Sequence, residues 1–460
     1  MTPLWIGQTI AEATGGTLSA PFAVSGVAFD SREVQPGDLF VAMRGEHADG
    51  HDYVGKALAA GAAGFLVERA VEGPHVRVPD SFEALVALGK AARARTEAKI
   101  VGVTGSAGKT GTKEALFHAF DRMSFGAAHR SLKSYNNHVG VPLSLARMPA
   151  ATRYGIFEMG MNHEGELRAL TAQVRPHVAI VTTIAPAHIE YFGTEEKIAE
   201  AKAEIFEGLV EGGTAIIPFD SPHRDLLVRL ATPHAARIVT FGLDKRADVH
   251  PLETVPADHG GGTLVNAQLP ETVLSFTLSM PGRHWIANAM AVLAAVQAVG
   301  GDLAVAGLAL ARLPGMPGRG ERRHVRTPDG GEALLIDESY NANPASMAAT
   351  LAQLGEEPAG RRVAILGAMK ELGAQSAALH AGLAEPVLAA GVERVLLVGE
   401  EMAPLADTLA SKIETELVPD AIEAAGLAAT MLKSGDVVLI KGSNSVGLSR
   451  LVTALSVETV

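Results

Sequence analysis

The feature that most constrains the fold is the stretch at residues 99–123, KIVGVTGSAGKTGTKEALFHAFDRM. It begins with an apolar run at 100–103 that predicts a buried strand, continues through a glycine-containing loop, and ends in apolar residues at helical spacing. A strand, a glycine loop and a helix in this order form a phosphate cradle, because glycines let backbone N–H groups turn toward an anion and the helix N-terminus adds partial positive charge. The stretch therefore predicts a nucleotide-binding α/β domain.

The loop carries the residue types that a P-loop uses on a nucleoside triphosphate. Lys109 is expected to reach the β- and γ-phosphates, and the Thr110 hydroxyl to bind Mg²⁺. The full pattern has its first glycine where this chain has Val103, so T-G-S-A-G-K-T is the part that matches. The alternative is a glycine turn that merely joins a strand to a helix. The predicted nucleotide contacts of the loop are Thr104, Gly105, Ser106, Ala107, Gly108, Lys109, Thr110 and Gly111.

The length and charge of the chain narrow the class of protein. With 460 residues it is too long for one hydrophobic core, and about three domains are expected. A net charge of -12 argues against nucleic acid or an anionic membrane as partner. The absence of cysteine excludes disulfides and thiolate chemistry. Because the N-terminus does not resemble a signal peptide and no apolar run approaches roughly 20 residues, we expect a cytoplasmic protein without a membrane partner.

Three α/β domains are predicted: a small N-terminal domain at 1–97, a central P-loop domain with a parallel sheet at 98–313, and a Rossmann-like C-terminal domain at 314–460. The Pro- and Gly-rich segment 312–320 separates the last two and predicts a hinge. The C-terminal domain lacks the G-x-G-x-x-G fingerprint of dinucleotide binding. A β-hairpin is expected at 263–280 and a helix at 284–299. Strands are expected at 27–29, 39–41, 65–67, 100–103, 156–159, 178–183, 214–218, 237–241, 333–336, 363–366, 395–398, 417–418 and 437–440.

Two polar residues follow predicted strands of the central sheet. Glu158 ends one strand and His188 comes just after the next. Ligands of parallel sheets bind outside the carboxyl ends of the strands, so both residues should lie at the same edge as the phosphate loop. His284 and Asn288 are spaced i and i+4, which places them on one helix face.

At this point the chain resembles the Mur ligases, the ATP-dependent amide-forming enzymes of peptidoglycan precursor synthesis, from about residue 24 to about residue 452. The resemblance is carried by T-G-S-A-G-K-T, by S-Y-N-N-H-V-G-V-P-L-S-L from Ser134, by E-M-G at Glu158, by A-P-A-H-I-E at His188, by A-K-A-E-I-F around Lys202 and by G-R-H-W-I-A-N ending in Asn288.

The resemblance also assigns roles to individual residues. It implies that Glu158 and His188 bind a second Mg²⁺, and that Lys202, in the position that the family carbamylates, ligates or orients Mg²⁺. Arg319 is expected to swing toward the γ-phosphate when the C-terminal domain closes. The remaining expected contacts are Asn288, Asp337 and Asn341 for ATP, Asn136 and Asn137 for substrate, and Ser31 and Arg32 for the uracil and diphosphate of a UDP-linked substrate.

Within the family, three stretches look like the branch that adds D-alanyl-D-alanine to UDP-N-acetylmuramoyl-tripeptide. They are D-E-S-Y-N-A-N-P-A-S from Asp337, L-G-A-M-K-E-L-G from Leu366 and K-G-S from Lys441. The first unit's D-S-R-E-V-Q-P-G-D-L-F-V-A is similar to the UDP-binding domain of that branch, and the D-N-P-R motif typical of the diaminopimelate-adding branch is absent. One departure is Ala368, where the family commonly has Asp. The third residue of the peptide, diaminopimelate or lysine, stays open.

The implied reaction phosphorylates a carboxylate with ATP and lets an amine attack the acyl phosphate, with two Mg²⁺ ions neutralising charge. Lys109, Glu158, His188, Lys202 and Arg319 are the predicted catalytic residues. A related alternative is folylpolyglutamate synthase, which shares the central and last domains but lacks the UDP-binding domain. An alternative from another class is a nucleotide-gated binding protein, which would need only one metal. A monomer is expected.

Overall fold

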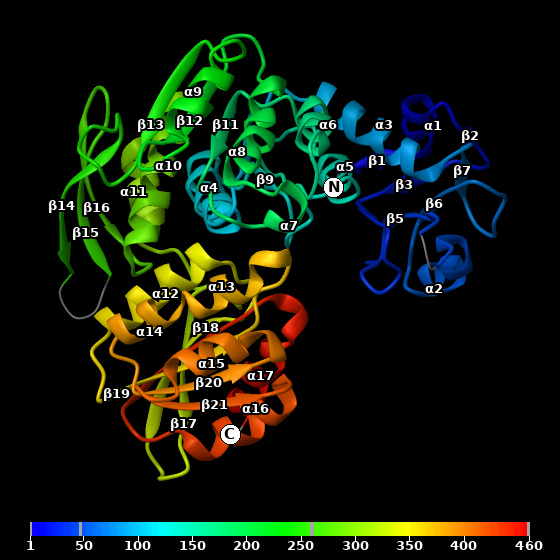
Figure 1. Cartoon of the computed structure of the whole chain (residues 1–460). Helices are drawn as coiled ribbons and strands as arrows, with labels where there is room; N and C mark the ends of the chain where they lie inside the picture. Colours follow the sequence, from blue (N-terminus) through cyan, green and yellow to red (C-terminus); the bar gives the residue numbers. More distant parts are fainter. Residues whose placement is uncertain (1, 46–47, 258–261, 458–460) are drawn as a thin grey trace.

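The computed structural model describes residues 2–45, 48–257 and 262–457, and within them the chain forms three successive α/β lobes (Figure 1). The N-terminal lobe lies at one side of the central lobe, and the C-terminal lobe lies beneath it, with α12 and α13 at their junction. The α/β class and the three-lobed arrangement are confirmed. The boundaries at 97/98 and 313/314 stay predictions.

The N-terminal lobe has a five-stranded sheet in the order β2-β7-β6-β5-β4, parallel except for the β2–β7 pair. Phe40 on β5 and Phe65 on β6 are buried in its core. Helix α3 begins where the Asp80 carboxylate accepts from the backbone N–H groups of Phe82 and Glu83. The elements are β1 (Trp5–Ile6), α1 (Gly7–Thr14), β2 (Thr17–Leu18), β3 (Ala23–Val24), β4 (Gly26–Ala28), β5 (Asp38–Val41), the 3₁₀ helix Gly50–Tyr53, α2 (Val54–Ala59), β6 (Gly64–Val67), β7 (His75–Arg77) and α3 (Ser81–Ala94).

The central lobe has a six-stranded parallel sheet in the order β13-β12-β11-β8-β10-β9. Strand β8 lies inside the sheet, and Ile100 packs into one apolar cluster while Val101 and Val103 pack into another on the opposite face. Burial on both faces explains why this strand is a continuous apolar run in the sequence. The elements are β8 (Lys99–Thr104), α4 (Lys109–Ser124), β9 (Ala128–Arg130), α5 (Gly140–Ala146), β10 (Tyr154–Glu158), α6 (Glu166–Val174), β11 (Val178–Val181), α7 (Ile189–Phe192), α8 (Glu195–Ala203), the 3₁₀ helix Glu204–Gly208, β12 (Thr214–Pro218), α9 (Arg224–Ala231), β13 (Arg237–Phe241), α10 (Arg283–Ala298) and α11 (Leu303–Leu310).

Two details of the central lobe differ from the sequence-based expectation. The predicted hairpin at 263–280 is part of a three-stranded antiparallel sheet, β14 (His250–Pro256), β15 (Thr263–Gln268) and β16 (Val273–Leu278). Strand β14 was not predicted because it is mostly exposed and therefore lacks an apolar run. Edge strand β9 is three residues long and carries His129 and Arg130, so it gave no apolar signal either.

The C-terminal lobe has a six-stranded sheet in the order β17-β18-β22-β19-β20-β21. All pairs are parallel except β17–β18, which is antiparallel, so the doubly wound sheet carries an antiparallel edge strand that the sequence did not reveal. The elements are β17 (Glu321–Arg326), β18 (Glu332–Glu338), α12 (Pro344–Glu356), β19 (Arg361–Gly367), the 3₁₀ helix Gly373–Gln375, α13 (Ser376–Ala381), α14 (Ala384–Ala389), β20 (Arg394–Val398), the 3₁₀ helix Glu400–Met402, α15 (Ala403–Leu409), β21 (Glu414–Val418), α16 (Ala421–Met431), β22 (Asp436–Lys441), the 3₁₀ helix Asn444–Val446 and α17 (Leu448–Val457).

None of the described helices combines the length and the apolar character that crossing a bilayer requires.

Candidate functional site

A cavity of about 720 Å³ is lined by residues that follow the carboxyl ends of β8, β10 and β11 in the central sheet and of β18, β19 and β22 in the C-terminal sheet. Parallel strands place their carboxyl ends at one sheet edge, so two sheets that face each other across a hinge bring two sets of loops to one site. Glu158 and His188 both line this cavity with the phosphate loop, as the strand pattern predicted.

The phosphate loop has the conformation that its glycines require. Gly105 has a φ of 149°, and a Cβ there would lie 1.9 Å from the Thr182 hydroxyl oxygen. Gly108, with a φ of 82°, precedes α4, and the Asn288 carboxamide packs directly against it. The loop therefore places backbone N–H groups at a helix N-terminus, which is a favourable place for an anion.

Lys109 and Lys202 lie close together at this loop, and both line the cavity. Lys109 donates to the Gly105 carbonyl at 2.6 Å, and burial lowers its pKa. Lys202 is 1% exposed, and burial, with the nearby charge of Lys109, lowers the pKa of Lys202 well below its usual value. The environment thus favours the neutral amine of Lys202.

Glu158 is the most heavily contacted carboxylate in the cavity. Its Oε2 accepts from the Thr110 hydroxyl at 2.9 Å, and its Oε1 accepts from Asn136 Nδ2 at 2.8 Å. The ammonium of Lys113 lies 3.7 Å from Oε2. Glu158 itself is 1% exposed. These contacts fix the position of its carboxylate beside the phosphate loop.

His188 faces the C-terminal lobe across the cavity. It has a φ of 61°, and its Nδ1 contacts the carboxylate of Glu371, which also has a positive φ of 63°. The contact with His188 lowers the pKa of Glu371. An imidazole and a carboxylate from two lobes therefore meet at the rim of the cavity.

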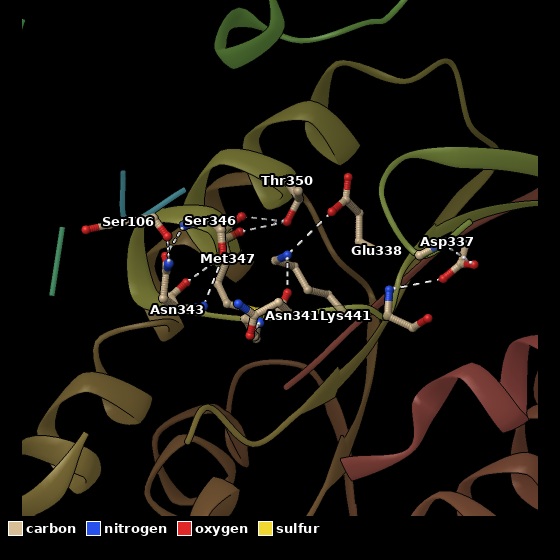
Figure 2. A network of polar contacts seen from close by, with 12 residues as sticks. Ser106, Asp337, Glu338, Asn341, Asn343, Ser346, Met347, Thr350 and Lys441 are labelled. Atoms are coloured by element: carbon tan, nitrogen blue, oxygen red, sulfur yellow. Dashed lines mark hydrogen bonds and ion pairs between the residues drawn. The ribbon is translucent and has the colours of Figure 1, made fainter. Parts of the chain in front are cut away.

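The C-terminal lobe contributes a second polar network to the cavity (Figure 2). Lys441 donates to the Asn341 carbonyl at 2.8 Å and lies 3.4 Å from a Glu338 carboxylate oxygen. Glu338 and Lys441 are paired in register at the ends of β18 and β22, which explains why they meet. Burial raises the pKa of Glu338 and lowers the pKa of Lys441.

Two residues connect this network to the phosphate-loop side. Asn343 caps α12 by accepting from the Ser346 N–H, and its Nδ2 donates to the Ser106 carbonyl at 3.1 Å. Arg319 lies 4.1 Å over the Tyr340 ring, and its Nη2 is 3.4 Å from the Ser134 hydroxyl. The arginine predicted in the hinge thus lies in the cavity and contacts the central lobe.

The structure brings most of the predicted site residues to this one cavity. The predicted residues among its lining are Ser106, Ala107, Gly108, Lys109, Thr110, Gly111, Asn136, Glu158, His188, Lys202, Asn288, Arg319 and Asn341.

Six predicted residues lie outside the lining, and their contacts stay predictions. Thr104 is the last residue of β8, Gly105 follows it at the start of the loop, and Asn137 accepts from the Gly140 N–H at 2.9 Å. Asp337 is buried. One of its carboxylate oxygens accepts from the backbone N–H of Gly318 in the hinge, and the other accepts from the backbone N–H of Ser339. Ser31 and Arg32 lie in the N-terminal lobe, where the Arg32 guanidinium pairs with Asp30.

Sequence reasoning missed several cavity or site residues. Lys113 is a lysine on a helix, which usually indicates a solvated face, yet its side chain is 0% exposed. Asn343 precedes Pro344 and Ser346, a helix-capping signal that could have been recognised. His284 was noted only as a helix-face residue, yet it lines the cavity, and burial lowers its pKa to about 4. Ala368, the departure from the family pattern, is fully buried in the apolar core and not in the cavity lining.

The donors at the cavity fit Mg²⁺ bound together with a nucleotide. The described residues include no group of three or more His, Asp or Glu side chains arranged to hold a metal by themselves. Thr110 and Glu158 present oxygen atoms 2.9 Å apart at the phosphate loop. Mg²⁺ usually keeps several waters and takes one or two carboxylates plus substrate phosphates, so such a sparse set of oxygens is suitable.

Three family models match consecutive parts of the chain. They describe the Mur ligase family catalytic domain at residues 23–113, the Mur ligase middle domain at 103–296 and the Mur ligase glutamate ligase domain at 318–444.

Similar proteins extend over the full length. UDP-N-acetylmuramoyl-tripeptide--D-alanyl-D-alanine ligase of Escherichia coli is 34% identical over 98% of this chain and 98% of its own, and that of Rickettsia prowazekii is 32% identical over 98% and 99%. Among solved structures, MurF from Acinetobacter baumannii has a TM-score of 0.85 at 28% identity and covers 99% of both chains. MurF from Thermotoga maritima in complex with ADP has a TM-score of 0.76 at 28% identity, over 94% of this chain and 97% of its own. Because relatives above 30% identity match nearly its whole length, and three Mur ligase models match consecutive parts of it, the chain belongs to the Mur ligase family.

Proposed function

We propose that this protein is an ATP-dependent ligase that adds D-alanyl-D-alanine to UDP-N-acetylmuramoyl-tripeptide in peptidoglycan precursor synthesis, releasing ADP and phosphate. The observation that carries the proposal is one cavity that gathers the phosphate loop, the carboxylate of Glu158 and Lys202 from the central lobe, and Arg319 and Lys441 from the C-terminal lobe. Full-length similarity to ligases of this name supports the choice of substrates.

The residues of the cavity suit the formation of an acyl phosphate. Lys109 and the loop N–H groups hold the ATP phosphates, and Lys109 must leave the Gly105 carbonyl to do so. Thr110 would hold a first Mg²⁺, and Glu158 with His188 a second, and these ions would supply charge neutralisation for the transferred phosphoryl group. Arg319 reaches the same cavity from the hinge and places a guanidinium where negative charge develops. The substrate carboxylate attacks the γ-phosphorus and ADP leaves, which gives the acyl phosphate. The amine of D-alanyl-D-alanine then attacks the acyl carbon, phosphate leaves, and the nitrogen loses a proton as the amide forms.

Phosphate release with purified components tests the proposal. UDP-N-acetylmuramoyl-tripeptide and D-alanyl-D-alanine should together release phosphate from ATP, and omission of either should abolish release. The matched comparison is a folate with glutamate, because folylpolyglutamate synthase shares two of the lobes. Phosphate release with that pair and not with the first would contradict the proposal.

We also propose that the N-terminal lobe binds the UDP end of the substrate through Ser31 and Arg32. Arg32→Ala should raise the KM of the nucleotide-sugar substrate about tenfold, because a hydrogen bond to a charged group is lost. The KM of ATP should change less than about twofold. Initial-rate kinetics with each substrate varied in turn measures both constants.

Arg246→Ala is the matched control for that variant. Arg246 pairs with Asp244 two residues earlier, with the same geometry as Arg32 with Asp30, but it lies on the central lobe. Equal losses for ATP and the UDP substrate in Arg32→Ala would indicate general misfolding instead of a local contact.

Closure about the hinge should control turnover. Gly318 has a φ of 72°, donates its N–H to Asp337 and packs against Tyr340, next to Arg319. Gly318→Pro removes that donor and cannot adopt the positive φ, so kcat and KM should change together. Solution scattering of the wild type should show compaction on addition of ATP and UDP-N-acetylmuramoyl-tripeptide, and identical curves would remove the hinge from the mechanism.

We place this reaction in the cytoplasm. The absence of a membrane-spanning helix among the described residues agrees with that location, and the use of ATP as co-substrate supports it.

A further inference from the structure

The segment at residues 131–137 connects the N-terminal lobe to the catalytic cavity. It follows β9 and precedes α5, and it belongs to neither a helix nor a strand. Lys133 has a φ of 51° within it, in the left-handed region that a lysine rarely adopts. Such backbone persists only where the surroundings hold it in place.

One set of side chains of this segment contacts the N-terminal lobe. The Tyr135 hydroxyl donates to Glu33 Oε2 at 2.6 Å, and the Lys133 ammonium contacts the other oxygen of the same carboxylate. The Tyr135 ring also packs on Phe29, with centroids 5.8 Å apart. Glu33 directly follows Arg32, one of the proposed contacts with the UDP substrate, so the segment is attached to the substrate-binding loop itself.

The alternate side chains of the same segment face the catalytic cavity. Asn136 donates to Glu158, and the Ser134 hydroxyl meets the Arg319 guanidinium. Both residues line the cavity. Glu158 and Arg319, both assigned to phosphoryl transfer, therefore contact this segment. The residues that alternate with those contacts, Lys133 and Tyr135, bind the N-terminal lobe.

The buried side chain of Lys113 is bonded to the backbone of the segment 131–137. The Lys113 ammonium donates to the Lys133 carbonyl at 2.8 Å and lies 3.1 Å from Glu114 and 3.7 Å from Glu158. Because the Lys113 side chain is 0% exposed, its ammonium cannot exchange these partners for water. It joins the phosphate-loop helix α4, the backbone of the segment and the catalytic carboxylate.

We propose that Glu33 and Tyr135 are positioning residues that couple occupation of the UDP-substrate site to the placement of Glu158 and Arg319 in the catalytic cavity, through the segment 131–137 anchored by Lys113. The inference rests on the proposed function, because it takes the N-terminal lobe as the UDP-binding lobe. Neither residue touches the reacting atoms. Substrate bound beside Glu33 would hold the segment in the arrangement in which Asn136 and Ser134 orient their partners.

The measurement that separates a positioning role from a merely structural one is the effect of each substrate on the affinity for the other. Calorimetry gives the Kd of a non-hydrolysable ATP analogue with and without UDP-N-acetylmuramoyl-tripeptide. In the wild type, the substrate should tighten analogue binding about tenfold, within the usual range of coupling between two sites. In Tyr135→Phe and in Glu33→Gln this factor should fall below about twofold, while the Kd of the analogue alone stays unchanged.

Turnover should follow the coupling. Tyr135→Phe keeps the ring contact with Phe29 and removes one hydroxyl, and its kcat should fall about tenfold. Glu33→Gln removes the charge of the carboxylate that Tyr135 and Lys133 share, so the losses of the two single variants should not add in the double variant. Tyr154→Phe is the matched control: its ring stacks on Phe120 at the opposite end of β10 from Glu158, and it should keep wild-type kcat and coupling.

The outcomes separate this inference from the proposed function. Wild-type turnover of the ligase substrates, with Tyr135→Phe and Glu33→Gln indistinguishable from Tyr154→Phe in both coupling and kcat, would overturn the inference alone. A wild type that binds neither UDP substrate nor D-alanyl-D-alanine productively would overturn the proposed function and the coupling with it.

Discussion

Replacing Lys109 with alanine should lower kcat by roughly 10³-fold or more at saturating ATP, because charge stabilisation accounts for most of the catalysis in phosphoryl transfer. The Lys109 ammonium lies in the phosphate loop, and burial lowers its pKa. A contact between this ammonium and a phosphate would be screened less than a contact at the protein surface. Single-turnover and steady-state phosphate release both measure the effect.

Lys99→Ala is the control for that variant, since Lys99 is an exposed residue at the start of β8, the strand that leads into the phosphate loop. It should keep wild-type kcat. A Lys109→Ala protein that turns over at a near wild-type rate with saturating ATP would remove the phosphate loop from the catalytic mechanism.

Replacing Lys202 with alanine should leave the protein nearly inactive, and short carboxylic acids such as formate or acetate should partly restore turnover. Burial and the charge of Lys109 lower the pKa of Lys202, which favours a neutral amine. A neutral amine can add to CO₂, forming an N–C bond and releasing one proton, and the product is an anionic carbamate. We propose that the carbamate supplies the hard oxygen atoms that this part of the cavity needs for Mg²⁺.

The controls separate the carbamate from a simple loss of packing. Lys202→Arg keeps a long side chain but forms no carbamate, because its guanidinium stays protonated, and added carboxylic acids should not rescue it. Lys197→Ala changes an exposed lysine on the same helix, α8, and should have little effect. ¹³C NMR of the wild type in ¹³CO₂-equilibrated buffer should show a carbamate signal that Lys202→Ala lacks. A Lys202→Ala protein that keeps most of its activity in CO₂-depleted buffer would show that the carbamate assignment is wrong.

The parallel strands of the fold could be predicted because burial on both faces leaves a continuous apolar run in the sequence. Strand β8 is the clearest case, and β22 is buried along its whole length in the same way. Strand β17 could not be predicted, because an exposed edge strand with the sequence E-R-R-H-V-R has no apolar periodicity. Charged edge strands are common because their charges discourage association with other sheets. The same charges replace the apolar residues by which a strand is recognised in a sequence.

The residues of the candidate site could be predicted where a chemically reactive or charged residue lies at the end of a predicted strand. Lys109, Thr110, Glu158 and His188 were found because each lies at or after the carboxyl end of a strand of one parallel sheet, and all four line the cavity. The contacts between lobes could not be found in this way. The approach of Asn343 to Ser106 spans 237 residues, and no local pattern encodes such a distance.

The residues that hold the catalytic side chains in place could not be predicted from the sequence either. Lys113 resembles a solvated helix lysine until the structure shows its ammonium buried against Glu158 and the Lys133 carbonyl. Glu33 and Tyr135 are more than 100 residues apart, and nothing in either local sequence indicates that they meet. The sequence can show which groups carry the chemistry, whereas tertiary structure is needed to show what holds them.

The most direct test of the proposed reaction follows the oxygen of the substrate carboxylate. UDP-N-acetylmuramoyl-tripeptide with ¹⁸O in its terminal carboxylate is incubated with ATP, D-alanyl-D-alanine and the wild-type protein, and product and phosphate are analysed by mass spectrometry. An acyl phosphate transfers one carboxylate oxygen to phosphate. With both carboxylate oxygens labelled, we therefore predict a product equal in mass to the two substrates minus one H₂¹⁸O, with one ¹⁸O kept in the new amide, and one ¹⁸O atom in each phosphate released. Unlabelled phosphate beside that product, or no joined product at all, would contradict the assignment of this chain as an acyl-phosphate-forming D-alanyl-D-alanine ligase.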